Sequence, residues 1–167
     1  TVPVVKTIAG ITKTGKTAVF STPATAKSEY LAELIHKFAS NVSVECVGGS
    51  NLEEAVEKGE IDTPETIETL EKHLIPLVEH GVDAIALGCT HYPFLRDRVQ
   101  QIVGPSVQVV DSGGAVARRL KYILEHENLL SQQKGRDVYY TTGSKEKFDR
   151  VSSKLIKRTI ESEQIVL

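Results

Sequence analysis

Residues 81–93 read GVDAIALGCTHYP, and this stretch decides how the rest of the chain folds. Residues 82–87 are apolar almost throughout, which predicts a central strand of a parallel sheet that is buried on both faces. The apolar run ends abruptly in a thiol, a hydroxyl, an imidazole and a phenol, and Pro93 follows. Ligands of α/β proteins bind at the carboxyl ends of the strands, so Cys89 stands where chemistry is usually done.

Strand and helix signals alternate on both sides of this strand. Hydrophobic periodicity predicts further strands at 17–21, 42–46 and 107–110. Helices are expected after Ser112 and at 24–39, 52–58, 64–80 and 93–103. The alternation predicts an α/β fold with a doubly wound, mostly parallel sheet of four core strands.

Capping residues, prolines and glycines mark where the helices begin and end. Thr63 is expected to cap the helix that starts at Pro64, Pro76 to kink that helix, and Gly81 to end it. Asp111 and Ser112 offer a cap for the helix that follows them. That helix is expected to bury its apolar stripe, which consists of Val116, Leu120, Ile123 and Leu124.

The last part of the chain follows a polar stretch at 131–136. It predicts a strand at 138–142, a helix at 145–156 and a strand at 164–167. These elements either extend the first sheet as edge strands or belong to a second sheet whose other strands lie outside this chain. Periodicity leaves both alternatives open.

Composition sets broad limits. The 167 residues suit one domain, or one domain with an appendage, and the net charge of −2 without a basic block disfavours nucleic acid and anionic membranes as partners. No apolar run approaches the ~20 residues that span a bilayer. Two cysteines fit a reducing, cytoplasmic setting. The chain begins at Thr1 and contains no methionine, so we expect a processed or truncated chain.

The surroundings of Cys89 suit proton transfer. A helix that begins at Pro93 would direct free N–H groups and a positive dipole end toward the thiol. This arrangement favours a thiolate base or nucleophile, and equally an anionic ligand such as a carboxylate, with Thr90 adding a hydroxyl. The alternatives are that Cys89 is a small buried apolar residue and that His91 caps the helix.

Other candidates carry weaker signals. Cys46 also falls at the end of a predicted strand, which allows a Cys46–Cys89 pair, although a packed core thiol is the better interpretation. No CxxC or HxxxH pattern supports a metal site, and the glycine pairs at 48–49 and 113–114 match no phosphate-binding motif. The remaining histidines are interpreted as structural: His36, His73, His80 and His126.

The sequence GCTHYP at 88–93, after VDAIAL, closely resembles the second active-site motif of bacterial glutamate racemases. Four other segments resemble the same family: residues 3–5, TPATAKS at 22–28, VDSG at 110–113 and YTTGS at 140–144. The similarity therefore extends over nearly the whole chain.

This resemblance implies inversion of the α-carbon of glutamate without a cofactor or a metal. One thiolate removes the α-proton and a second thiol returns a proton from the opposite face. Cys89 would be one of the two catalytic thiols, Thr90 and His91 would bind the substrate, and Glu57 would fall near an auxiliary acidic position of the family. The product, D-glutamate, would supply cell-wall peptidoglycan, and no nucleic acid or membrane partner is implied.

Two departures from the family pattern limit what the chain can do. An Asp-Ser-Gly motif near the start and the Cys-Asn-Thr motif of the opposing thiol are both absent, and Cys46 matches a position outside catalysis, with Val47 in place of a proline. Residues 1–112 therefore resemble a second α/β domain, and 113–167 a segment that returns to a first domain outside this sequence. We expect the chain alone to be inactive and to need that missing half or a homo-oligomer.

The alternatives are a racemase of the same superfamily that acts on aspartate or another amino acid, and a non-catalytic binding module.

Overall fold

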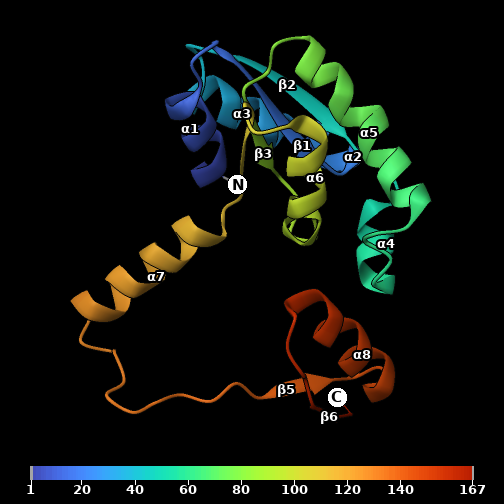
Figure 1. Cartoon of the computed structure of the whole chain (residues 1–167). Coiled ribbons are helices and arrows are strands. Elements are labelled where there is room, and N and C mark those ends of the chain that lie inside the picture. Colours follow the sequence, from blue (N-terminus) through green and yellow to red (C-terminus); the bar gives the residue numbers. More distant parts are fainter. Residues whose placement is uncertain (1, 167) are drawn as a thin grey trace.

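A four-stranded parallel sheet forms the centre of the computed structural model, which describes residues 2–166 (Figure 1). The strand order is β2-β1-β3-β4, and every neighbouring pair is parallel. The chain moves outward from β1 in both directions, which is the doubly wound arrangement. The predicted α/β class is confirmed. The strands are β1 (Lys16–Ser21), β2 (Ser43–Gly48), β3 (Ala84–Leu87) and β4 (Gln108–Val110).

Helices cover both faces of this sheet. On one face α1 (Val2–Ile11) and α3 (Glu29–Phe38) pack against Val19, Ala84 and Ala86. The other face of the sheet carries Phe20, Ile85 and Leu87. Its cover consists of α4 (Leu52–Lys58), α5 (Pro64–Glu79), the 3-10 turn η1 (Tyr92–Leu95) and α6 (Arg96–Val103). All four residues of β3 are buried, as expected for a central strand.

Local hydrogen bonds change some of the expected helix boundaries. The helix expected at 24–39 is wrong, because α2 (Pro23–Ala26) ends and the Ser28 hydroxyl accepts a hydrogen bond from the Leu31 amide to start α3. The helix expected from Pro93 begins instead as the turn η1, in which the Tyr92 amide donates to the Cys89 carbonyl at 3.2 Å. The cap at Thr63 is confirmed, and α5 continues through Pro76.

The helix α1 lies where no element was expected. Its sequence is rich in β-branched residues, which have low helix propensity. Val4, Val5 and Ile8 are fully buried, so tertiary packing overrides that preference.

The last part of the chain forms a separate unit. β5 (Tyr139–Thr141) and β6 (Ser162–Gln164) pair in parallel on either side of α8 (Lys145–Ile156), and they do not extend the first sheet. We call this segment the C-terminal unit. It lies beside α4, and residues 127–138 connect it to α7 (Gly113–His126) (Figure 1).

The expected burial of the α7 stripe is wrong. Val116 and Leu120 are 54% and 56% exposed, and α7 projects away from the sheet (Figure 1). The stripe has the predicted spacing, but no residue of α7 is buried. No helix in this described range combines the length and the apolar character that crossing a bilayer requires.

Candidate functional site

The carboxyl ends of the parallel strands bring the candidate residues to one edge of the sheet. β1 and β3 are paired up to Phe20 and Leu87, so Thr22 and Cys89 leave the sheet side by side. Asp111 follows β4 at the same edge. Cys89 is half-buried against the core, as its position after an apolar strand predicts.

Cys89, His91 and Glu57 form a chain of contacts at this edge. The sulfur of Cys89 lies 3.8 Å from Nδ1 of His91, and Nε2 of His91 lies 3.2 Å from a carboxylate oxygen of Glu57. When Nε2 carries the proton and donates a hydrogen bond to the carboxylate, Nδ1 is free to accept a proton from the thiol. A carboxylate that orients an imidazole beside a nucleophile is the usual arrangement for activating a thiol or hydroxyl.

Tyr92 fixes the segment that carries the thiol. Its side chain is completely buried, and its hydroxyl donates toward the carbonyls of Gly49 (2.9 Å) and Ser21 (3.2 Å). Burial raises the pKa of Tyr92, and the nearby charges of Glu53 and Cys89 raise it further. Tyr92 therefore remains a hydrogen-bond donor and ties the chain after β3 to the ends of β1 and β2.

Two glycines allow the strand ends to approach this closely. A Cβ at Gly88 would lie 3.0 Å from Val19, and a Cβ at Gly48 would lie 2.6 Å from the backbone of Pro23. Contacts this short leave no room for a side chain at Gly48.

Two threonine hydroxyls lie at the site: Thr90, which was expected there, and Thr22 at the end of β1, which sequence reasoning did not assign to it. Thr22 follows the strand directly; its hydroxyl donates a hydrogen bond to the Thr25 hydroxyl at 3.0 Å and accepts one from the Thr25 amide. Thr90 is exposed beside Cys89. Hydroxyl groups around a thiol at a strand end suit a carboxylate ligand, and a threonine at the end of a predicted strand is the signal that could have revealed Thr22.

Cys46 does not belong to this group. β2 continues to Gly48, so Cys46 lies within the strand opposite Val19 and not at its end, and the expected position is wrong. Both thiols are free. Within residues 2–166 no group of three or more His, Cys, Asp and Glu side chains is arranged to hold a metal ion.

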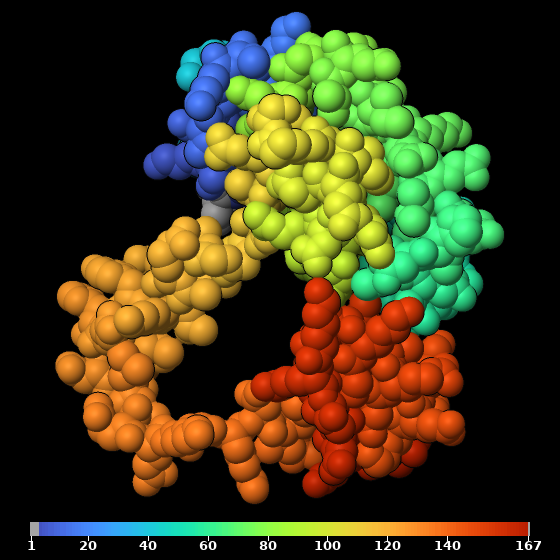
Figure 2. All heavy atoms as spheres, viewed as in Figure 1, coloured from blue at the N-terminus to red at the C-terminus, as the bar shows by residue number. Residues whose placement is uncertain are grey.

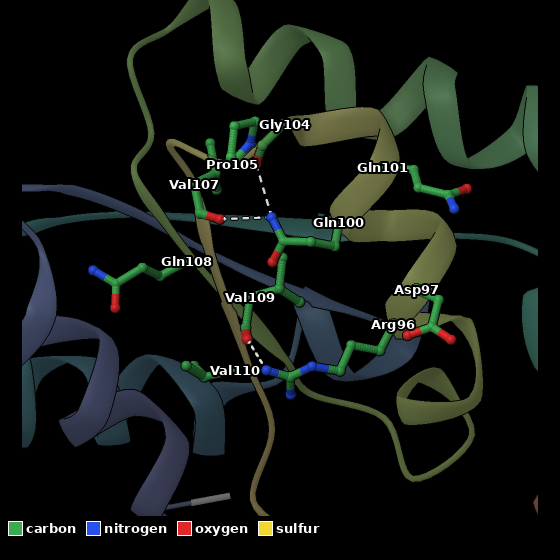
Figure 3. Close-up of a pocket in the computed structure, with 10 residues that line it drawn as sticks. All are labelled: Arg96, Asp97, Gln100, Gln101, Gly104, Pro105, Val107, Gln108, Val109 and Val110. Carbon is green, nitrogen blue, oxygen red and sulfur yellow. Dashed lines mark hydrogen bonds between the residues drawn. The ribbon is translucent and has the colours of Figure 1, made fainter.

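A groove of about 810 Å³ lies between α6 and β4 (Figure 3), and Cys89 is not among the residues that line it. Gln100 crosses it and donates to the carbonyls of Gly104 and Val107, and Arg96 donates to the carbonyl of Val109 and pairs with Asp111. Arg96 thus occupies a carbonyl of the edge strand β4, and Gln100 occupies two carbonyls of the turn that leads into it. These two side chains therefore help to protect the edge of the sheet.

A second cavity, of about 530 Å³, adjoins the site. His91, Glu57 and Phe94 line one side of it, and Lys147 and Phe148 of α8 line the other. The C-terminal unit thus contributes to the surroundings of the His91–Glu57 pair.

The chain has a doubly wound sheet, and a cysteine and a histidine follow its central strand. It is therefore an α/β protein with a thiol at the carboxyl edge of its sheet. The profile of the family described as Asp/Glu/hydantoin racemase matches residues 3–120. The chain belongs to this family.

Individual relatives agree with this assignment. The chain is 38% identical over 150 residues to a glutamate racemase of Ectopseudomonas mendocina (strain ymp), covering 89% of this chain and 57% of the relative. It is 36% identical over 151 residues to a glutamate racemase of Herpetosiphon aurantiacus, covering 89% and 59%. The chain thus spans little more than half the length of the curated relatives it matches.

Solved structures show the same fold. The glutamate racemase isoform RacE1 of Bacillus anthracis superimposes with a TM-score of 0.84 at 26% identity, over 99% of this chain and 63% of that one. The Escherichia coli glutamate racemase, solved with L-glutamate and the activator UDP-MurNAc-Ala, gives 0.76 at 28% identity, over 95% and 60%.

Proposed function

We propose that this chain carries one of the two catalytic thiols of a glutamate racemase, which interconverts L- and D-glutamate without a cofactor. The observation that carries the proposal is the contact chain from Cys89 through His91 to Glu57, at the edge where α/β proteins bind ligands. The family match and the glutamate racemases among the relatives support the substrate.

The geometry supports a direct proton transfer. The thiolate of Cys89 takes the α-proton, so the Cα–H bond breaks, an S–H bond forms, and the electron pair is delocalised into the substrate carboxylate. A thiol on the opposite face then donates its proton to Cα, which inverts the centre. His91 holds and returns the proton of Cys89, and the hydroxyls of Thr90 and Thr22 bind the substrate together with His91.

The second thiol is proposed to come from outside this chain. Cys46 lies within β2, and the family's Cys-Asn-Thr motif is absent from the sequence. Residues 1–112 would form the second α/β domain, and 113–167 would complete a first domain. The exposed stripe of α7 and the isolated two-stranded sheet support this division. Figure 2 shows an open space bounded by α7, the 127–138 connection and the C-terminal unit, where such a domain could pack.

The chain alone would then be inactive, and the complete enzyme would act in the cytoplasm and supply D-glutamate for peptidoglycan. A racemase for aspartate or another amino acid is the second candidate, because the family profile includes aspartate and hydantoin racemases. A non-catalytic binding module is the third, favoured by the single thiol at the site.

Exchange of the substrate α-proton with solvent deuterium tests these candidates. The full reading frame that encodes this chain is expressed, and L- and D-glutamate and aspartate are incubated in D2O and followed by NMR. Cys89→Ser should lower exchange of the enantiomer whose α-proton faces Cys89 by about 10²–10⁴-fold, the usual contribution of a positioned acid–base group, whereas Cys46→Ser serves as the matched control. Exchange with aspartate alone would support the second candidate, and unchanged exchange in Cys89→Ser would overturn the role of Cys89.

A further inference from the structure

Helix α8 meets the end of α4 through a hydrogen bond from Lys154 and an apolar contact from Val151. Nζ of Lys154 donates a hydrogen bond of 2.5 Å to the carbonyl of Gly59, the residue that ends α4 in a left-handed conformation with φ +73°. The Lys154 stem lies over the same glycine, because a Cβ built on Gly59 would lie 3.5 Å from Cδ of Lys154. The next residue, Leu155, packs against the main core.

The part of α4 held in this way carries Glu57. Glu57 lies two residues before Gly59 in the last turn of the helix, and its side chain is 68% exposed. The packing of Glu57 itself therefore does little to fix its carboxylate. Its contact with His91, at 3.2 Å, weakens steeply with small displacements, so the position of the last turn of α4 decides whether the contact exists.

The cavity beside the contact between Glu57 and His91 makes the hydrogen bond of Lys154 more important. About 530 Å³ of open space separates Phe94 of η1 from Phe148 of α8, so the two elements do not brace each other there. Lys157 also reaches across from α8, but it pairs with Asp97 of α6 and both side chains are nearly 80% exposed. Exposed ion pairs of this kind contribute little.

We propose that Lys154 is a positioning residue: its hydrogen bond to Gly59 holds the last turn of α4 so that Glu57 stays on His91, and α8 thereby sets the reactivity of Cys89. The proposal rests on the proposed function for the importance of Cys89. The linkage from α8 to the thiol is a property of this chain alone and can be measured without turnover.

The test follows alkylation of Cys89 by iodoacetamide as a function of pH, in a Cys46→Ser background that leaves one thiol. Glu57→Gln should slow alkylation near neutral pH, because an unsupported imidazolium stabilises the thiolate less. Lys154→Met, which keeps the methylene stem but removes the donor, should slow alkylation by about threefold to tenfold, in the lower part of the range of coupling between contacting groups, and shift the pH–rate profile to higher pH. In the Lys154→Met/Glu57→Gln double variant the lysine substitution should have no further effect.

Two controls separate positioning from general stability. Lys157→Met removes a neighbouring cation of the same helix and should leave the profile unchanged, and Lys154→Arg should restore the wild-type profile. Thermal unfolding by circular dichroism confirms that each variant is folded. An equal slowing by Lys154→Met with and without Glu57 would overturn the proposal.

Failure of the racemase assignment has a different signature. In that case α-proton exchange is absent from the full reading frame, while the non-additivity of Lys154 and Glu57 persists.

Discussion

Replacement of Tyr92 by phenylalanine removes one buried hydroxyl from the base of the site. The Ser21 carbonyl keeps a partner, because it also accepts a hydrogen bond from the Gly49 amide at 2.9 Å. The Gly49 carbonyl loses the shorter of the two phenol contacts. Leaving one buried carbonyl unpaired costs about 1–3 kcal/mol, so we expect the free energy of unfolding to fall by about 2 kcal/mol.

Urea unfolding followed by circular dichroism measures this change. With a slope of about 2 kcal/mol/M, the midpoint should fall by about 1 M while the slope stays constant. Tyr30→Phe is the matched control, because Tyr30 is 62% exposed and its hydroxyl is in solvent. Equal midpoints for the two variants would refute the reasoning, since the phenol of Tyr92 would then not hold the strand ends together.

Three further outcomes are expected. Burial acts to raise the pKa of Asp83, but hydrogen bonds from the Thr12 hydroxyl and the amides of Lys13 and Thr14 outweigh it and lower that pKa below its ordinary value of 3.8. The carboxylate therefore stabilises the fold above about pH 4, and this contribution is lost as pH falls through the lowered pKa. The free energy of unfolding of Asp83→Asn should therefore be lower than that of wild type at pH 7 but not at pH 2. Gly48→Ala should lower the thermal midpoint because its Cβ meets the Pro23 backbone, whereas Gly10→Ala, with open space around it, should not; equal midpoints would contradict the steric argument. Leu120→Glu on the exposed stripe of α7 should reduce self-association of this chain in sedimentation velocity, whereas Lys121→Glu should not, and a monomeric wild-type chain would contradict this expectation.

The sheet could be predicted because its central strand is an unbroken apolar run. A strand buried on both faces needs such a run, and residues 84–87 are buried throughout. Helix boundaries were predicted less well, since they depend on single hydrogen bonds. The stripe from Tyr30 to Leu34 continues the periodicity expected at 24–39, but the Ser28 hydroxyl begins a new helix within that range.

The site could be predicted only in its local part. Cys89 and His91 are two residues apart, so their contact follows from the turn after β3. Glu57 lies 34 residues from His91 in sequence, and it reaches the imidazole only because the buried Leu52 and Val56 hold α4 against the core. Sequence spacing places a residue on a helix face, but the packing of that helix decides what the face meets.

The α7 stripe illustrates the same distinction. Its apolar spacing indicates a face that is normally covered, yet the spacing carries no information about the cover, and Val116 and Leu120 remain exposed. The position of Cys89 is similar: in the proposed function its thiol at the carboxyl edge would contact only one face of the substrate. α7 starts at this same edge, directly after β4 and Asp111. Under the proposed function, one partner domain would account both for the uncovered helix face and for the single thiol at one edge of the sheet, because it would cover α7 and present the second thiol opposite Cys89.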